Sequence, residues 1–181
     1  MSNAAKVTVV IPNYNGLKFM EPCFKALEMQ ICRDFEILVV DNGSGDGSVE
    51  WLKNQKDIKL CCNKENVGFP KGCNQGIAMA EADSDIWLLN SDTLVPPDAL
   101  FWLQMGLYES SDIGAAGSVT NFAPNYQNID DTTVTDQNYL NYAMRHKISV
   151  SNPYEKKIWL VGFSVLLKRK ALEQVGLLDE R

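Results

Sequence analysis

Metal-binding and disulfide-forming residues are scarce in this sequence of 181 residues. It contains one histidine, His146, and five cysteines, no two of which stand in a Cys-x-x-Cys pattern. This composition argues against a zinc site and against a disulfide framework. An odd number of irregularly spaced cysteines favours a reducing compartment, so we expect a cytoplasmic protein. His146 lies among polar residues, and we expect it on the surface.

Long hydrophobic runs and positive charge are also missing. The longest apolar stretch, residues 158–167, has ten residues including a glycine, which is too short for a membrane span. The first ten residues lack the basic and apolar regions of a secretory signal. The net charge is −6, and the only basic run is "KRK" at residues 168–170. We therefore do not expect a nucleic acid as partner.

What the sequence does contain is an alternation of two patterns. Apolar residues at helical spacing separate short β-rich runs at residues 7–12, 35–40, 58–62, 85–90 and 113–119. Alternating strands and helices predict an α/β fold with a mostly parallel, Rossmann-like sheet flanked by helices. In such sheets ligands bind beyond the carboxyl ends of the strands.

Composition divides the chain, which we expect to form one domain, into three stretches. Residues 1–119 carry the alternation and are expected to bind the ligand. Residues 120–157 are polar and rich in Asn and Thr, which predicts a variable insertion with one short helix near residues 137–147. Residues 158–181 return to an apolar strand, over residues 159–167, and a helix that ends at Gly176.

A carboxylate, Asp41, ends the second predicted strand and is followed by the loop "NGSGDGS". A dinucleotide fold needs three glycines after the first strand, where this chain reads "PNYNGLKF". A calcium loop needs oxygen ligands where Gly43 and Gly45 stand. The tail of the loop is expected to cap a helix through Asp46 or Ser48. Similar polar clusters end the first and fourth strands, so a cap does not explain Asp41, whose carboxylate suits the N3–H of uracil or thymine.

Five segments follow one another in a characteristic order: "VTVVIPNYNG", "VVDNGSGDGSVEWL", "NVGFPKGCNQGI", "LLNSDTLVPPDAL" and "VGFSVLLKRKALEQVGLLDER". In this order and spacing they resemble family 2 glycosyltransferases, and most closely the bacterial rhamnosyltransferase-like branch. The resemblance implies a GT-A fold, a UDP- or dTDP-sugar donor, Mg²⁺ or Mn²⁺, and inversion at the anomeric carbon. It also implies a saccharide or lipid-linked acceptor of a surface polymer, and a place in the cytoplasm at the inner face of the membrane.

The resemblance also implies, residue by residue, a nucleotide-sugar site. Within it Asp41 would read the base, and Asp92 would hold the metal in the "NSD" that replaces the family's Asp-x-Asp motif. The full set of implied binding residues is Pro12, Asn13, Tyr14, Asn15, Asp41, Gly43, Ser44, Asn66, Gly68, Phe69, Asn74, Asn90, Ser91, Asp92 and Trp159.

Sugar transfer expels a nucleoside diphosphate, and a hard cation held by a carboxylate neutralises the charge on this leaving group. Since Mg²⁺ and Mn²⁺ keep waters and bind phosphate oxygens, one protein carboxylate suffices, and the amide of Asn90 can bond a ribose hydroxyl. A second departure from the family is Cys73, where many members carry Arg before the Asn. We interpret Cys73 as a buried helix residue, with Lys71 or the metal supplying the missing charge.

No residue of this sequence convincingly fills the role of general base, so the catalytic residue is unassigned. In the family the base lies in a Glu-Asp motif beyond the "DER" of residues 179–181, so the chain resembles the donor-binding part of a transferase. An apolar sheet face left uncovered there would favour a homodimer. Two alternatives stay open: a catalytically silent nucleotide-sugar binding module, and a nucleotidyltransferase, which needs a triphosphate loop that "PNYNGLKF" does not provide.

Overall fold

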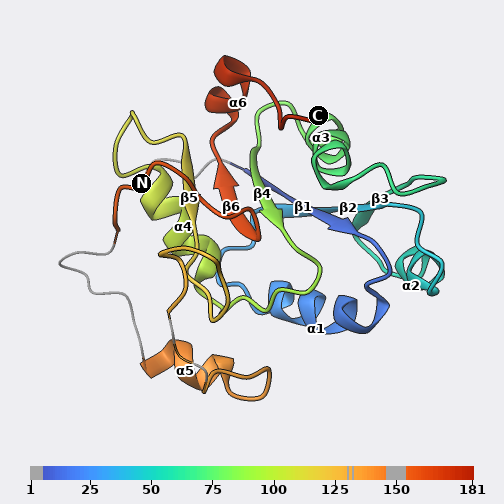
Figure 1. The fold of residues 1–181 in the computed structure, drawn as a ribbon, viewed down its shortest axis with the longest axis horizontal. Coiled ribbons are helices and arrows are strands. Elements are labelled where there is room, and N and C mark those ends of the chain that lie inside the picture. The colour runs from blue at the N-terminus through green and yellow to red at the C-terminus, as the bar shows by residue number, and fades with distance from the viewer. Residues whose placement is uncertain (1–5, 130, 132, 146–153) are drawn as a thin grey trace.

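The computed structural model describes residues 6–129, 131, 133–145 and 154–181, and a six-stranded sheet crosses their centre (Figure 1). The strands are β1 (Val7–Asn13), β2 (Phe35–Asp41), β3 (Ile58–Cys62), β4 (Asp85–Leu89), β5 (Ala115–Gly117) and β6 (Ser164–Leu167), in the order β3-β2-β1-β4-β6-β5. The strands β3, β2, β1 and β4 are parallel, and β6 runs antiparallel to both of its neighbours. The predicted mostly parallel α/β sheet is confirmed. His146 lies outside the described residues.

Helices cover both faces of the sheet, as Figure 1 shows. The core on one face joins the strands to α1 (Leu17–Glu28), α2 (Ser48–Lys53) and α4 (Ala99–Leu107). The core on the other face joins them to α3 (Phe69–Met79) and α6 (Arg169–Val175). The helix predicted in the insertion is α5 (Tyr139–Arg145), which stands apart at the lower edge of the view. No helix in the described ranges is long and apolar enough to cross a membrane.

The alternation of side chains along β1 explains the two cores. Val7, Val9 and Ile11 lie in the core that contains α1 and α4, whereas Val10 packs with Cys73 of α3 on the opposite face. The approach of α3 is close, because a Cβ at Gly76 would lie 2.3 Å from Val10 Cγ1. Cys73 is fully buried, as predicted, and burial raises the pKa of its thiol to about 12.

Two strands are shorter than the sequence predicts. The run at residues 113–119 forms a strand only over Ala115–Gly117, and the apolar run at residues 159–167 forms one only over Ser164–Leu167. In both cases the backbone beyond the strand bonds to Gln127 of the insertion. Gln127 Nε2 donates to the carbonyl of Ser118 (2.7 Å), and the Val161 N–H donates to Gln127 Oε1 (2.6 Å).

Candidate functional site

The topological switch point of the sheet lies between β1 and β4, and we call the region beyond the carboxyl ends of these two strands the crevice. The chain runs from β1 outward through β2 and β3, and then returns to β4 on the other side of β1. In open parallel sheets ligands bind at such a point, beyond the carboxyl ends of the strands. Side chains from both strand ends converge there: a Cβ at Gly16 would lie 2.4 Å from Asn13 Oδ1 and 3.1 Å from Ser91 Oγ.

A buried network joins the ends of β1 and β2. Asn13 and Asp41 are paired in register, and Asn13 Nδ2 donates to Asp41 Oδ2 (2.8 Å). Ser44 donates twice to the same carboxylate, from its N–H to Oδ1 (2.9 Å) and from its Oγ to Oδ2 (2.7 Å). Asp41 is fully buried, and these bonds use three of its roughly four acceptor positions. The sequence prediction that these residues meet at one rim is therefore confirmed.

Asn13 carries an unpaired acceptor. Its Oδ1 is buried and has no hydrogen-bond partner among the residues that the structure describes. Leaving a buried acceptor unpaired costs about 1–3 kcal/mol, so such atoms are rare outside functional or strained positions. The acceptor lies beside Ser91, on the side of the crevice that carries the "NSD" motif.

The loops after β1 and β2 hold each other in place. The Asn15 N–H donates to Ser44 Oγ, and the Gly45 N–H donates to Asn15 Oδ1, both at 2.9 Å. Asn15 has a φ of 51°, a left-handed conformation that Asn tolerates better than most residues. Pro12 is half-buried, and Tyr14 is exposed at the tip.

Asp46 connects the first turns of two helices. Its Oδ2 accepts the N–H of Leu17, the first residue of α1, and its Oδ1 accepts the N–H and the hydroxyl of Ser48, the first residue of α2. Burial raises the pKa of Asp46, but these hydrogen bonds outweigh burial and hold the pKa below its ordinary value. The expectation that Asp46 or Ser48 is the cap residue is wrong, because the N-cap residues of α1 and α2 are Gly16 and Gly47. Asp46 stands one residue before the N-cap of α2 and bonds the first residues of both helices.

Three amides that sequence reasoning did not single out support the next loop. Asn63 Nδ2 donates to Asn42 Oδ1 (2.8 Å), and Asn63 also exchanges hydrogen bonds with Gln75 of α3. Asn42 Nδ2 donates in turn to the carbonyl of Gly68 (3.2 Å). The signal in the sequence was that polar residues continue past the ends of β2 and β3. These bonds keep residues 63–68, which include the predicted Asn66 and Gly68, beside the loop after β2, so closely that a Cβ at Gly43 would lie 2.8 Å from the backbone of residue 65.

The amide of Asn74 bonds to the segment after α6 and to none of the other predicted residues. Its Nδ2 donates to the Leu178 carbonyl (2.9 Å) and to Glu180 Oε1 (2.8 Å), and its Oδ1 accepts the Leu178 N–H (3.0 Å). Both N–H groups of the amide and one acceptor position of its oxygen thus join α3 to the segment after α6. Phe69, at the start of the same helix, is exposed, and a Cβ at Gly162 would lie 3.9 Å from its ring.

Asp92 is exposed, and none of the hydrogen bonds or ion pairs among the described residues involves its carboxylate. Burial, with a smaller contribution from the charge of Asp92, raises the pKa of the Cys23 thiol to about 12. No group of three His, Cys, Asp or Glu side chains suited to a metal occurs in the described part of the chain. A single accessible carboxylate fits an ion of the Mg²⁺ type, whose other ligands are waters and phosphate oxygens. Asn90, two residues earlier, has a buried Oδ1 without a partner in the described residues.

Trp159 lies on the β6 side of this edge. The segment that carries it reaches the end of β4, where the Asn90 N–H donates to the Phe163 carbonyl (2.8 Å). Its position depends on Gln127, which is buried and joins the insertion to Ser118 and to Val161. No feature of the sequence distinguishes Gln127 from the other polar residues of the insertion.

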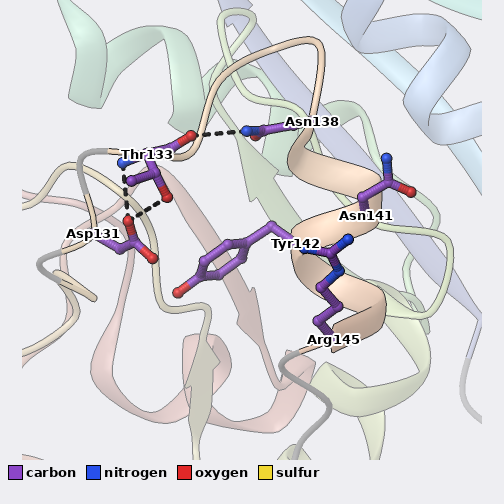
Figure 2. A pocket seen from close by; sticks show the side chains of 6 residues that line it. All are labelled: Asp131, Thr133, Asn138, Asn141, Tyr142 and Arg145. Carbon is purple, nitrogen blue, oxygen red and sulfur yellow. Dashed lines mark hydrogen bonds between the residues drawn. The ribbon is translucent and has the colours of Figure 1, made fainter.

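A pocket in the insertion, shown in Figure 2, contains none of the predicted site residues. Asp131 accepts the N–H and hydroxyl of Thr133 at 2.9 and 2.6 Å, and Asn138 Nδ2 donates to the Thr133 carbonyl (2.8 Å). The remaining lining residues are Asn141, Tyr142 and Arg145. Because α5 stands away from the sheet in Figure 1, we locate the candidate site at the strand ends instead.

Comparisons with known proteins identify the family of the chain. A family profile described as "Glycosyl transferase family 2" matches residues 8–176. The uncharacterized glycosyltransferase YfnE of Bacillus subtilis (strain 168) is 37% identical over 97 residues, which make up 51% of this chain and 24% of that protein.

Two solved structures are also similar to this chain. Mannosyltransferase PcManGT from Pyrobaculum calidifontis, in complex with GDP-Man and Mn²⁺, matches 99% of this chain and 49% of that one, with 21% identity and a TM-score of 0.66. S. aureus TarS 1-349 in complex with UDP-GlcNAc matches 57% of this chain and 31% of that one, with 26% identity and a TM-score of 0.50. This chain spans less than half the length of each of these three proteins.

Proposed function

Because the chain belongs to glycosyl transferase family 2 and has the GT-A fold, we propose that it binds the donor of an inverting, metal-dependent sugar transfer. The observation that carries this proposal is that the side chains of Asn13 and Ser91 converge at the switch point. The residue after Ser91 is Asp92, whose carboxylate is exposed. That arrangement places hydrogen-bonding groups and a metal-binding carboxylate at the crevice where parallel sheets bind nucleotides.

The donor we propose is a UDP- or dTDP-sugar, with hexosyl or rhamnosyl transfer as the reaction. Asp41 keeps about one acceptor position beyond its three internal bonds, which suits the single N3–H of uracil or thymine. The complex of the TarS neighbour with UDP-GlcNAc supports a uridine donor. The internal bonds hold the carboxylate in one orientation. Because Asp41 is fully buried, the loops after β1 and β2 would have to shift for a base to reach it.

On the phosphate side, Asp92 would hold Mg²⁺ or Mn²⁺, which supplies positive charge to the diphosphate leaving group. The unpaired oxygens of Asn13 and Asn90 are buried, so they would accept from hydroxyl groups of the donor only after the neighbouring loops shift. The acceptor we propose is a saccharide or lipid-linked saccharide, and the reaction is a direct displacement whose general base is not assigned. All five cysteines are free thiols, which supports a reducing, cytoplasmic setting.

A catalytically silent nucleotide-sugar binding module is the second candidate. Two acidic residues near the end of the chain, Asp179 and Glu180, bond to Arg181 and Asn74. Neither is joined to the network of Asn13, Asp41 and Ser44 by any hydrogen bond of the described residues. A donor site without a base would give binding without transfer.

Calorimetric titration with UDP, dTDP, CDP and GDP, each with and without Mn²⁺, tests the proposal. We expect Mn²⁺-dependent binding of UDP or dTDP, and a loss of about tenfold or more in affinity for Asp92→Asn. Asp83→Asn is the matched control, because this exposed carboxylate lies before β4, at the opposite end of the strand from Asp92. Equal affinity of Asp92→Asn and the parent would refute the metal assignment. Absence of binding to every nucleotide would refute the donor site.

A further inference from the structure

Two exposed aromatic side chains from distant parts of the chain meet beside the candidate site. The rings of Tyr126 and Trp159 lie 6.3 Å apart between centroids at an interplanar angle of 70°. Their exposed fractions are 42% and 51%, so each ring keeps a large accessible area. Phe122, in the same insertion, is 89% exposed and has no ring contact among the described residues. Single exposed apolar residues are ordinary, whereas a fixed pair of rings is not.

Hydrogen bonds between the buried side chain of Gln127 and the backbone hold the Tyr126 and Trp159 segments in place. Gln127, next to Tyr126, bonds through both ends of its amide, donating to Ser118 and accepting from Val161. The Thr120 N–H donates to the Gln127 carbonyl (2.8 Å), which closes the loop that carries Tyr126. Both rings therefore stand on segments anchored to the sheet, and little conformational entropy would be lost on binding a ligand.

Polar groups border the rings. Lys157 Nζ lies over one face of the Tyr126 ring, 4.7 Å from its centroid, and pairs with Glu155 at 2.8 Å. A cation and a carboxylate thus stand beside an apolar surface, where they can donate to and accept from hydroxyl groups. A pyranose ring has this same combination, with an apolar C–H face and hydroxyl groups around its edge.

The pair is also connected to the proposed donor site. Phe163, four residues after Trp159, accepts the N–H of Asn90 at the end of β4. Gly162 lies against the ring of Phe69 at the start of α3. The segment that carries Trp159 therefore forms the β6 side of the crevice whose other side carries Asn13.

We propose that Tyr126 and Trp159 form a platform for the acceptor saccharide, in which a pyranose ring stacks on the face of Trp159 and contacts Tyr126, since the two rings lie in a T-shaped arrangement. The assignment to the acceptor rests on the proposed function, since the donor's nucleotide occupies the β1 and β2 side. A hydrophobic protein partner or a membrane would use Phe122 and Ile158, which are more exposed, as much as the ring pair. A saccharide would depend on the two rings alone.

The test is a titration of the chain, labelled with ¹⁵N, with cellobiose, maltose, chitobiose and mannobiose, followed through the indole N–H signals of its four tryptophans. The Trp159 signal is assigned by its loss in Trp159→Phe. We expect a saturable shift of this signal with at least one disaccharide at millimolar concentration. Tyr126→Ala should weaken that binding about threefold to tenfold, the effect of losing one aromatic contact. Phe122→Ala is the control and should bind as the parent does.

Two outcomes overturn the proposal: a Trp159 signal that none of the disaccharides moves, and binding that Phe122→Ala weakens as much as Tyr126→Ala. Titration of the same samples with UDP and Mn²⁺ separates the two proposals. If UDP binds but no disaccharide moves the Trp159 signal, the platform is refuted and the donor site is supported. Disaccharide binding without nucleotide binding supports the platform as a saccharide site and refutes the donor site.

Discussion

Adding one methyl group at Gly16 tests the geometry of the crevice directly. The φ of Gly16 is −106°, which alanine adopts without strain, so any cost comes from contacts of the new side chain. The Cβ would lie 2.4 Å from Asn13 Oδ1, and relieving that overlap requires a shift of about 1 Å. Asn13 is 1% exposed and its Nδ2 is bonded to Asp41, so the amide cannot move without breaking that bond.

We expect Gly16→Ala to lower the free energy of unfolding by about 1–3 kcal/mol, as overpacking of a buried site usually does. Asn13→Ala alone should cost about 1–2 kcal/mol, because Asp41 loses a buried hydrogen bond. In the Asn13→Ala background the contact with Asn13 is gone, and only the 3.1 Å contact with Ser91 Oγ remains. There Gly16→Ala should cost clearly less than in the parent, because the Ser91 hydroxyl needs to shift by only a few tenths of an ångström and the unfolded chain loses entropy.

Urea unfolding of the four proteins in this double-mutant cycle gives the answer, provided the m-values agree. Gly45→Ala is the matched control, since a Cβ there meets nothing within 4 Å and should change stability little. A Gly16→Ala variant as stable as the parent would refute the geometry of the crevice. An equal cost in both backgrounds would show that Asn13 is not the group that Gly16 must avoid.

Two further predictions concern groups whose pKa values the fold changes. Asp46→Ala should destabilise by about 1–2 kcal/mol at neutral pH, because two helices lose a bond at their first turn. The pKa of Asp46 is lowered in the folded state, so the stability difference between parent and variant should be present above the ordinary Asp pKa and should vanish as the pH falls through the lower folded value. Unfolding curves at several pH values measure this difference. A difference that does not change with pH would contradict the prediction. Burial raises the pKa of the Cys23 and Cys73 thiols to about 12, with a smaller contribution from Asp92 at Cys23. At pH 8 an alkylating reagent should therefore modify the exposed Cys62 first, and Cys23 and Cys73 only after unfolding, which peptide mass spectrometry measures. Early labelling of Cys73 would contradict its burial.

The central strands β1, β2 and β4 were predictable from sequence because long apolar runs form them, and the run of the edge strand β3 is also rich in apolar residues. Apolar β-rich runs predicted β1 to β4 within one residue at either end, and the polar residues that end β1 and β2 meet in register. The edge strand β5 and its neighbour β6 were predicted too long. Their continuations bond to Gln127, and a contact between residues so far apart in sequence leaves no local pattern.

The site shows the same division. Asn13, Asp41 and Ser44 were placed together because the carboxyl ends of parallel strands share an edge. Asn74 was grouped with them through a motif, but the structure bonds its amide to a segment that follows α6. The position of a side chain around a helix depends on what packs against each face, and sequence order does not supply that.

The two halves of the crevice differ in how much of their hydrogen bonding is internal, and this has a consequence for the proposed reaction. On the β1 and β2 side, the donors around Asp41 come from the protein itself, so the orientation of a bound base would be fixed in advance. On the β4 side, Asp92 is exposed and bonded to no described residue. Its position would be fixed only when an ion and a diphosphate complete the coordination sphere. Under this proposal the nucleoside supplies most of the affinity and the metal supplies most of the charge stabilisation during transfer. Loss of Asp92 would then reduce transfer more strongly than it reduces binding of the nucleoside alone.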